Sequence, residues 1–124
     1  MNLRDPKITA LQFNQYINAQ DIQGIISLMA ENYTFISISG NIEKGKDINI
    51  KGWISFFNNY PDYKNIFTRV ESRDNLVILI GYSTCSYDPL DGPAIWTATI
   101  EDDLVAKWQI YEDTKEIRKK LNIV

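Results

Sequence analysis

The chain has 124 residues, a mass of 14.3 kDa and 44% hydrophobic residues, which predicts a single ordered domain over residues 1–124. It contains no histidine and one cysteine, Cys85, which excludes Ser-His and Cys-His catalysis, histidine-ligated or cysteine zinc sites, and intrachain disulfides. The net charge is −3 and the basic residues are scattered apart from residues 118–120, so no nucleic-acid-binding face is expected.

Nothing in the sequence predicts export or a membrane. The N-terminus lacks the apolar core of a signal peptide, and the longest apolar run, residues 76–80, is much shorter than a membrane span. We therefore expect a cytoplasmic protein without a membrane partner, in which Cys85 is a small buried hydrophobe.

The first third of the sequence predicts two helices. Asp5 and Pro6 are typical of an N-cap followed by the first helical position, and apolar residues then recur at helical spacing. Asp21 is expected to cap a second helix. Gly24 weakens that helix by about 1 kcal/mol relative to alanine, so it should be short.

A strand and a third helix are predicted next. Residues 33–39 are rich in aromatic and β-branched side chains, and residues 40–41 (Gly-Asn) favour a turn. Asp47 is the expected N-cap of a helix that ends at residues 61–62 (Pro-Asp). Gly52 falls inside this helix and is interpreted as a place where another element approaches closely.

The remainder of the chain predicts consecutive antiparallel strands, separated by turn signals. The expected strands cover residues 65–73, 76–87, 94–101 and 104–112, and a terminal helix follows over residues 113–121. Helices followed by a meander indicate an α+β fold. Three N-terminal helices would pack in a curved antiparallel sheet, with a short C-terminal helix.

The strand over residues 76–86 is apolar or small on both faces. One face is expected to meet the helices, so another layer should cover the other face in so short a chain. A second copy of the sheet supplies that cover most simply. The sequence therefore predicts a homodimer through the outer sheet face.

Three segments resemble the SnoaL-like branch of the nuclear transport factor 2-like superfamily. They are residues 45–47 (Gly-Lys-Asp) before the third helix, 61–63 (Pro-Asp-Tyr) after it, and 108–113 (Trp-Gln-Ile-Tyr-Glu-Asp) on the last strand. With the order of elements, the resemblance covers nearly the whole chain. It implies a cone-shaped fold with a pocket at its open end, and dimers through the outer sheet face. The superfamily includes isomerases, cyclases, dehydratases, epoxide hydrolases and non-catalytic domains, so it implies no single function.

Without histidine, a base in such a pocket has to be a carboxylate, whose pKa burial would raise toward neutrality. By position, Asp113 resembles the acidic residue at the end of the last strand in SnoaL-like cyclases, where it would act as general base. Its local sequence also fits the N-cap of the terminal helix. Glu112 shares the face of Trp108 and points either into the cavity mouth or into solvent.

Arg69 and Glu71 lie on one face of a predicted strand. Epoxide hydrolases of the superfamily use an Asp-Arg-Asp arrangement to activate water, but no second aspartate can be placed beside Arg69. The other interpretation is an exposed ion pair with little effect on stability.

Aromatic residues are numerous for this length, with three tryptophans and seven tyrosines. Those on faces expected to point inward either fill the core or line a pocket for a small hydrophobic or aromatic molecule. They are Tyr16, Tyr33, Trp53, Phe56, Tyr60, Trp96 and Trp108. Tyr87 and Asp88 could form a rim or lid of that pocket.

Three functions remain compatible with the sequence. The first is a dimeric cone-fold protein that binds a small organic molecule in an apolar pocket, without a cofactor or metal. The second is a cofactor-independent isomerase, cyclase, lyase or hydrolase, with Asp113 as base and Tyr16 or Trp53 as donors to an oxyanion. The third is an interaction module with a filled cavity.

Overall fold

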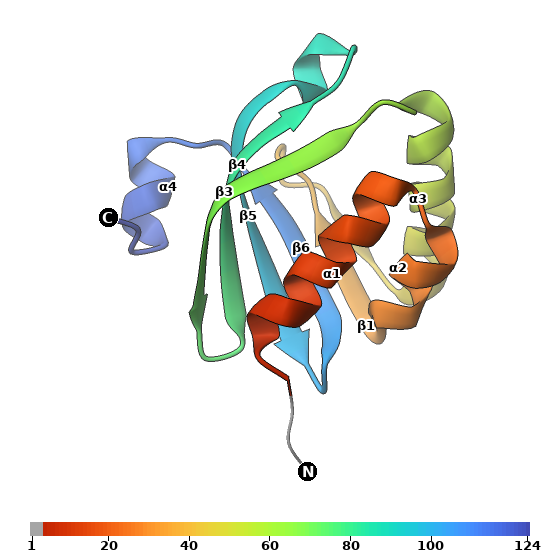
Figure 1. The fold of residues 1–124 in the computed structure, drawn as a ribbon, viewed down its shortest axis with the longest axis horizontal. Helices are drawn as coiled ribbons and strands as arrows, with labels where there is room; N and C mark the ends of the chain where they lie inside the picture. Colours follow the sequence, from red (N-terminus) through yellow and green to blue (C-terminus); the bar gives the residue numbers. More distant parts are fainter. Residues whose placement is uncertain (1–3) are drawn as a thin grey trace.

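The computed structural model describes residues 4–124 (Figure 1). In chain order the elements are α1 (Pro6–Ala19), α2 (Ile22–Leu28), β1 (Met29–Ile36), β2 (Ile42–Lys44), α3 (Lys46–Asn59), β3 (Lys64–Arg73), β4 (Leu76–Thr84), the short helix η1 (Asp88–Leu90), β5 (Gly92–Glu101), β6 (Leu104–Tyr111) and α4 (Lys115–Lys120). The predicted α+β fold is confirmed: three helices pack in a curved sheet, and a short helix follows the last strand. Among the described residues, no helix combines the length and apolar character needed to cross a membrane.

The first two helices start where the sequence predicts. The Asp5 side chain caps α1, with Pro6 in the first turn. The Asp21 side chain caps α2 by accepting a hydrogen bond of 3.0 Å from the Gly24 amide. In both cases a short acidic side chain satisfies backbone donors that the first helical turn leaves free.

The caps of the other two helices differ from the prediction. α3 begins after Gly45, whose φ of 105° is accessible to glycine, so Asp47 lies inside the first turn. α4 is capped by Thr114, whose Oγ1 accepts a hydrogen bond of 3.1 Å from the Ile117 amide. Asp113 precedes this cap, and the helix is shorter than predicted because it begins at Lys115.

The six strands form one sheet in the order β2-β1-β6-β5-β4-β3. The predicted meander from β3 to β6 is present, and each consecutive pair is antiparallel. β1 pairs with β6 in parallel, which differs from the antiparallel sheet expected throughout. A parallel pair joins strands separated by a long crossover, so no local sequence pattern signals it.

β3 and β4 bend together, which curves the sheet around the helices (Figure 1). Their pairing shifts register between Phe67 and Arg69, as in a β-bulge. Gly81 pairs with Phe67 at this point, and a Cβ on Gly81 would lie 2.9 Å from the Phe67 Cα. The two backbones therefore approach too closely for any residue but glycine.

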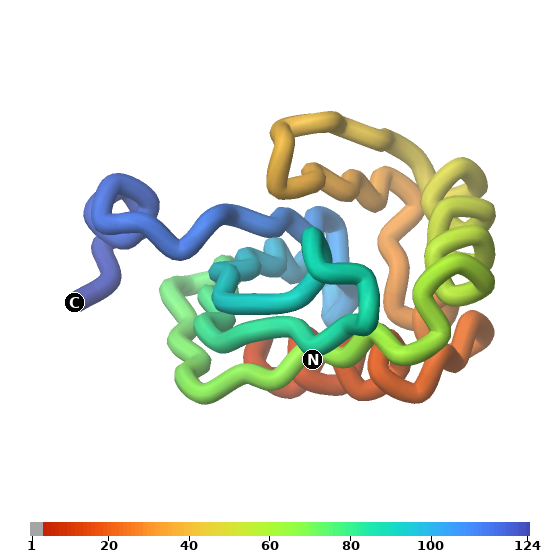
Figure 2. The backbone as a smooth tube through the Cα atoms, turned by 90° about the horizontal axis from the view of Figure 1, so that it is seen from above, coloured from red at the N-terminus to blue at the C-terminus, as the bar shows by residue number. Residues whose placement is uncertain are grey.

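The main core fills the concave side of the sheet under α1. Phe13 and Ile17 of α1, Tyr33 of β1, Trp96 of β5 and Trp108 of β6 are all less than 2% exposed. The ring centroid of Phe13 lies 5.1 Å from that of Trp108 and 6.0 Å from that of Tyr33. These contacts hold α1 across the sheet, while α3 and α4 stand at opposite ends of the molecule (Figure 2).

The outer face of the sheet is covered in part by the same chain. Ile117 and Leu121 pack, together with the buried Ile123, against a group of apolar side chains that includes Ile78 of β4 and Ile95 of β5. The two apolar faces of β4 are therefore explained without a second copy, which corrects the reasoning behind the predicted homodimer. The homodimer itself stays a prediction.

Candidate functional site

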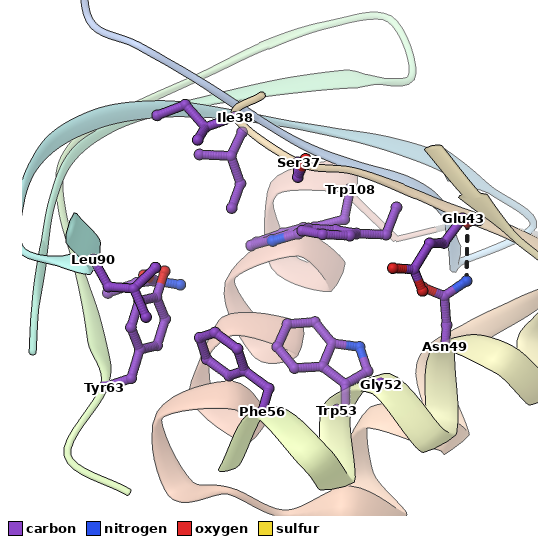
Figure 3. Close-up of a pocket in the computed structure, with 13 residues that line it drawn as sticks. Ser37, Ile38, Glu43, Asn49, Gly52, Trp53, Phe56, Tyr63, Leu90 and Trp108 are labelled. Atoms are coloured by element: carbon purple, nitrogen blue, oxygen red, sulfur yellow. Dashed lines mark hydrogen bonds between the residues drawn. The ribbon is translucent and has the colours of Figure 1, made fainter. Parts of the chain in front are cut away.

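A cavity of about 280 Å³ opens between α3, the β1–β2 hairpin, the beginning of β3 and the end of β6 (Figure 3). Large apolar side chains form its walls, and polar side chains stand at its two ends. Small-molecule sites commonly have this composition.

Helix α3 supplies one wall. Trp53 and Phe56 are three residues apart and so share a face of the helix, with ring centroids 6.1 Å apart. Gly52 borders the same space, and a Cβ there would meet only the Glu43 Oε2 atom, at 3.9 Å. Gly52 therefore borders open space instead of a closely packed element, which corrects the interpretation from sequence.

The sheet supplies the opposite wall. Phe35 of β1 is paired in register with Trp108 of β6, and Ile110 follows on the same face of β6. Trp108 is 1% exposed and packs against Phe13, so the core holds its ring in place. Trp53 and Trp108 thus face the cavity from opposite sides (Figure 3).

The loop between β4 and β5 reaches the cavity through Leu90. The Ser83 Oγ donates a hydrogen bond of 2.5 Å to the Leu90 carbonyl. The Asp91 Oδ1 accepts one of 2.9 Å from the amide of Cys85, which is buried as predicted. The loop expected as a rim therefore does border the cavity, by Leu90 and not by Tyr87.

One end of the cavity is formed by Tyr63 and Asn65. Asn65 is 3% exposed; its backbone amide donates to the Asn18 Oδ1 at 2.8 Å, and its Nδ2 donates to the Asn14 Oδ1 at 3.1 Å. Burial raises the pKa of Tyr63 to about 12, against the smaller opposing effect of the Ser83 and Asn65 side chains. The Tyr63 hydroxyl is therefore protonated at neutral pH.

The other end is formed by Glu43 and Asn49. Asn49 is 4% exposed, and its Nδ2 donates to the carbonyls of Glu43 at 3.1 Å and Gly45 at 2.7 Å. These bonds tie the beginning of α3 to β2. The Glu43 side chain projects toward the cavity (Figure 3), and it is the one acidic side chain among the described residues that line it.

Of the seven aromatic residues predicted to contact a ligand, Trp53, Phe56 and Trp108 line the cavity. Tyr60 does not line it; its ring packs between those of Phe56 and Tyr87, with centroid distances of 5.1 Å and 5.3 Å. Tyr60 thus packs against Phe56, which lines the cavity, without lining the cavity itself.

Tyr16, Tyr33 and Trp96 lie away from the cavity, which corrects their prediction as ligand contacts. Tyr33 and Trp96 are fully buried in the main core. Tyr16 packs its ring over Gly24, and its hydroxyl accepts a hydrogen bond of 3.1 Å from the Gln12 Nε2. Helical and strand periodicity identifies inward-facing side chains, but it does not separate the filled part of a core from a cavity wall.

Asp113 does not line the cavity. The Arg118 Nε donates to its Oδ1 at 2.6 Å, and the Arg118 Nη2 donates to its Oδ2 at 2.9 Å. This pairing holds the pKa of Asp113 below its ordinary value, whereas a general base that works near neutral pH needs a raised one. Asp113 is therefore neither a base in this cavity nor the cap of α4, which corrects both predicted roles. Of the two alternatives for Glu112, the structure shows the second, since its side chain is exposed to solvent.

Arg69 and Glu71 do form an ion pair, at the outer edge of β3 and away from the cavity. Arg73 joins them: its Nη2 lies 3.0 Å from the Glu71 Oε1 and donates to the Asn122 carbonyl at 2.8 Å. The Arg69 Nη1 donates to the Val124 carbonyl at 2.7 Å. The cluster fastens the segment after α4 and does not form a water-activating arrangement in the pocket.

Sequence reasoning missed five polar residues of the site, which are Ser37, Glu43, Asn49, Tyr63 and Asn65. Glu43 lies in β2 just before Gly45, the N-cap of α3, Asn49 lies in the first turns of α3, and Asn65 is the second residue of β3. Those positions at element ends were available signals, but their convergence on one cavity depends on the tertiary fold. No cluster of three or more potential metal-ligating side chains occurs in residues 4–124.

No protein-family model and no curated protein matches the sequence. Solved structures match over nearly the full chain. A structure from Shewanella putrefaciens CN-32, assigned to the SnoaL-like polyketide cyclases, is 12% identical, covers 98% of this chain and 88% of its own, and gives a TM-score of 0.77.

A nuclear transport factor 2-like protein of unknown function from Cytophaga hutchinsonii covers 98% of this chain and 99% of its own, at 16% identity and a TM-score of 0.71. The chain has the fold of the nuclear transport factor 2-like superfamily. The resemblance read from the sequence is thereby confirmed, and at these identities it establishes the fold alone.

A structure from Kribbella flavida assigned as a ketosteroid isomerase shares the fold, with 14% identity, a TM-score of 0.70 and coverage of 86% of this chain and 76% of its own.

Proposed function

We propose that this cone-fold protein binds a small, largely apolar molecule in the cavity between α3 and β6, without a cofactor. The observation that carries the proposal is the cavity itself. It stays open at about 280 Å³ beside a closely packed core, and Trp53, Phe56 and Trp108 line it. A ligand that covers such walls gains roughly 25 cal/mol for each Å² of apolar surface removed from water.

Two further points support this function. An interaction module with a filled cavity would place side chains in this space. The structural neighbours assigned as polyketide cyclases and as a ketosteroid isomerase are proteins named for small organic substrates. We extend this class of ligand, small organic molecules, to the present chain as part of the proposal.

The experiment uses Gly52, because its backbone accepts a side chain without strain. In Gly52→Leu the new side chain would extend from α3 into the cavity, whereas Gly52→Ala adds only the Cβ, which has room. Calorimetric titration with methyl β-naphthyl ether, a two-ring apolar probe, should show binding to the native chain. Gly52→Leu should weaken it by at least about tenfold, equivalent to about 1.4 kcal/mol.

The Gly52→Ala variant is the matched control and should bind the probe within about twofold of the native chain, since a single Cβ occupies little of the cavity. Both variants should remain folded, because each replaces an exposed helical glycine by a better helix former. Equal affinity of all three chains, or no binding to any, contradicts the proposal.

A second candidate function is acid–base catalysis, favoured by the Glu43 carboxylate at the cavity. With no histidine in the chain, Glu43 takes the position of base that the sequence assigned to Asp113. The test is deuterium exchange at the acidic carbon of β-tetralone, followed by NMR. Exchange above the buffer rate that Glu43→Gln abolishes and Asp113→Asn leaves intact supports catalysis. Exchange at the buffer rate excludes Glu43 as a base for such substrates.

A further inference from the structure

Glu43 brings an uncompensated negative charge to the cavity. Its side chain is exposed and projects toward the open space (Figure 3), and none of the four ion pairs in residues 4–124 includes it. No lysine or arginine is among the described residues that line the cavity. Lys44, the next residue of β2, lies on the opposite face of that strand, since successive side chains alternate. The Glu43 carboxylate is therefore accessible to a donor from outside the chain.

The β1–β2 hairpin and the beginning of α3 place this carboxylate beside two aromatic rings. Glu43 is paired in register with Phe35, so their side chains share one face of the hairpin, and both line the cavity. A Cβ on Gly52 would lie 3.9 Å from the Glu43 Oε2, and Gly52 immediately precedes Trp53. The ring centroids of Phe35 and Trp53 are 6.4 Å apart. The carboxylate and these two rings therefore border the same end of the cavity.

The aromatic walls favour a positive charge as well. The cavity is lined by the rings of Phe35, Trp53, Phe56, Tyr63 and Trp108. The face of an aromatic ring attracts a cation that lies within about 6 Å of the ring centroid, and tryptophan does so most strongly. An anionic group would lose its hydration there and meet a carboxylate without a compensating cation. The cavity thus combines apolar area for a ring system with two kinds of attraction for a cation.

We propose, on the basis of the proposed binding function, that the ligand is an aromatic molecule that carries a protonated amine on a short side chain. Its rings lie between Trp53 and Trp108, and its ammonium group donates a hydrogen bond to the Glu43 carboxylate beside Phe35. The positive charge, more than the size of the ring system, selects this ligand among apolar molecules.

The test compares three probes that share one ring system and differ in the group on one carbon: β-naphthylmethylamine, β-naphthylmethanol and β-naphthoate. The native chain should bind the amine at least about tenfold more tightly than the alcohol, because only the amine brings a positive charge to Glu43 and the rings. The naphthoate should bind more weakly than either. Calorimetric titration gives the dissociation constants, and the preference for the amine should shrink as salt is added, since salt screens an exposed charge pair.

Two variants assign the preference to Glu43. Glu43→Gln removes the charge at the same size, so the ratio of alcohol to amine dissociation constants should fall by at least about fivefold. The affinity for the alcohol should stay within about twofold of that of the native chain, because the alcohol carries no charge. The variant should fold, since the side chain is exposed and Asn49 binds the backbone carbonyl of residue 43.

Glu101→Gln is the matched control. It removes the same charge from an exposed residue that pairs with Leu104 at the beginning of β6, whereas the cavity borders Ile110 near the end of that strand. The ratio of alcohol to amine dissociation constants should stay within about twofold of the native ratio, because a distant surface charge is screened.

The outcomes separate the two proposals. Binding of the methyl ether that Gly52→Leu weakens, without a preference for the amine over the alcohol, overturns the inference about Glu43 and leaves the binding function standing. Tighter binding of the naphthoate also overturns it, as does an amine preference that Glu43→Gln leaves unchanged or that Glu101→Gln lowers equally. No binding of any probe overturns both proposals. An amine preference that Glu43→Gln lowers and Glu101→Gln retains supports both.

Discussion

Asp113 and Arg118 form an ion pair through two hydrogen bonds at the beginning of α4, with the Nε 2.6 Å from Oδ1 and the Nη2 2.9 Å from Oδ2. The same carboxylate is the one that the sequence favoured as a catalytic base. Asp113 is therefore a structural partner of α4, and any chemistry in the cavity has to use other side chains.

Asp113→Asn should lower the free energy of unfolding by about 0.5–1 kcal/mol near neutral pH, because the pair is partly exposed. The pKa of Asp113 is lowered in the folded chain, so the pair stabilises it above the ordinary value of 3.8, and this contribution is lost as the pH falls through the lowered pKa. Urea unfolding at about pH 7 and about pH 2.5 should show the difference shrinking at the lower pH.

The exposed Glu112 supplies the control for this experiment. Glu112→Gln removes one negative charge from the neighbouring position and should change stability by less than about 0.5 kcal/mol. Neither variant should alter probe affinity. A stability difference for Asp113→Asn that persists at low pH, or a loss of probe binding, would contradict the structural role.

The Arg73 guanidinium holds the segment after α4, with bonds to the carbonyls of Leu121 and Asn122. Arg73→Met keeps the apolar stem and loses these bonds, so trypsin should cleave after Lys119 and Lys120 faster than in the native chain. Limited proteolysis followed by mass spectrometry measures the rate. Arg69→Met is the control: it loses one hydrogen bond to a backbone carbonyl, whereas Arg73→Met loses two, so its cleavage should rise less. Unchanged cleavage in Arg73→Met would show that Arg73 does not hold the segment after α4.

Gly24 and Gly52 are both helical glycines, but the structure predicts opposite effects of alanine. Gly52→Ala should stabilise the chain by about 0.5–1 kcal/mol through helix propensity. Gly24→Ala should destabilise it by about 1–3 kcal/mol, since the new Cβ would lie 2.5 Å from the Tyr16 Cγ. Urea unfolding measures both.

A Tyr16→Ala background tests the cause of the Gly24 effect. Without the ring, Gly24→Ala should become neutral or stabilising, so the two substitutions should couple by at least about 1 kcal/mol. Additive effects of the two substitutions would show that the Tyr16 contact does not restrict this position.

The predicted homodimer can be tested by light scattering at micromolar concentration. A particle of twice 14.3 kDa would support it, and a particle of 14.3 kDa would contradict it. Because α4 and Ile123 already cover Ile78 and Ile95, a dimer would have to use the remainder of the outer face or displace α4.

The sequence by itself determined the features that depend on neighbouring residues. The caps at Asp5 and Asp21 are such features. So are the turns at Asp74 and at residues 102–103, where left-handed backbone appears as the turn residues predict. The order of helices and meander followed from the same local signals, and with them the fold class. The absence of histidine limited any base to a carboxylate.

The tertiary structure alone decided which inward-facing residues border a cavity. Trp96 and Trp108 have similar surroundings in sequence, yet Trp96 is enclosed by the core and Trp108 faces open space beside α3. Asn65, in turn, is oriented by Asn14 and Asn18 on a distant helix. Local patterns report which side of a strand or helix is apolar. The position of a cavity depends on how distant elements pack, and the parallel pairing of β1 with β6 has no signal in either strand.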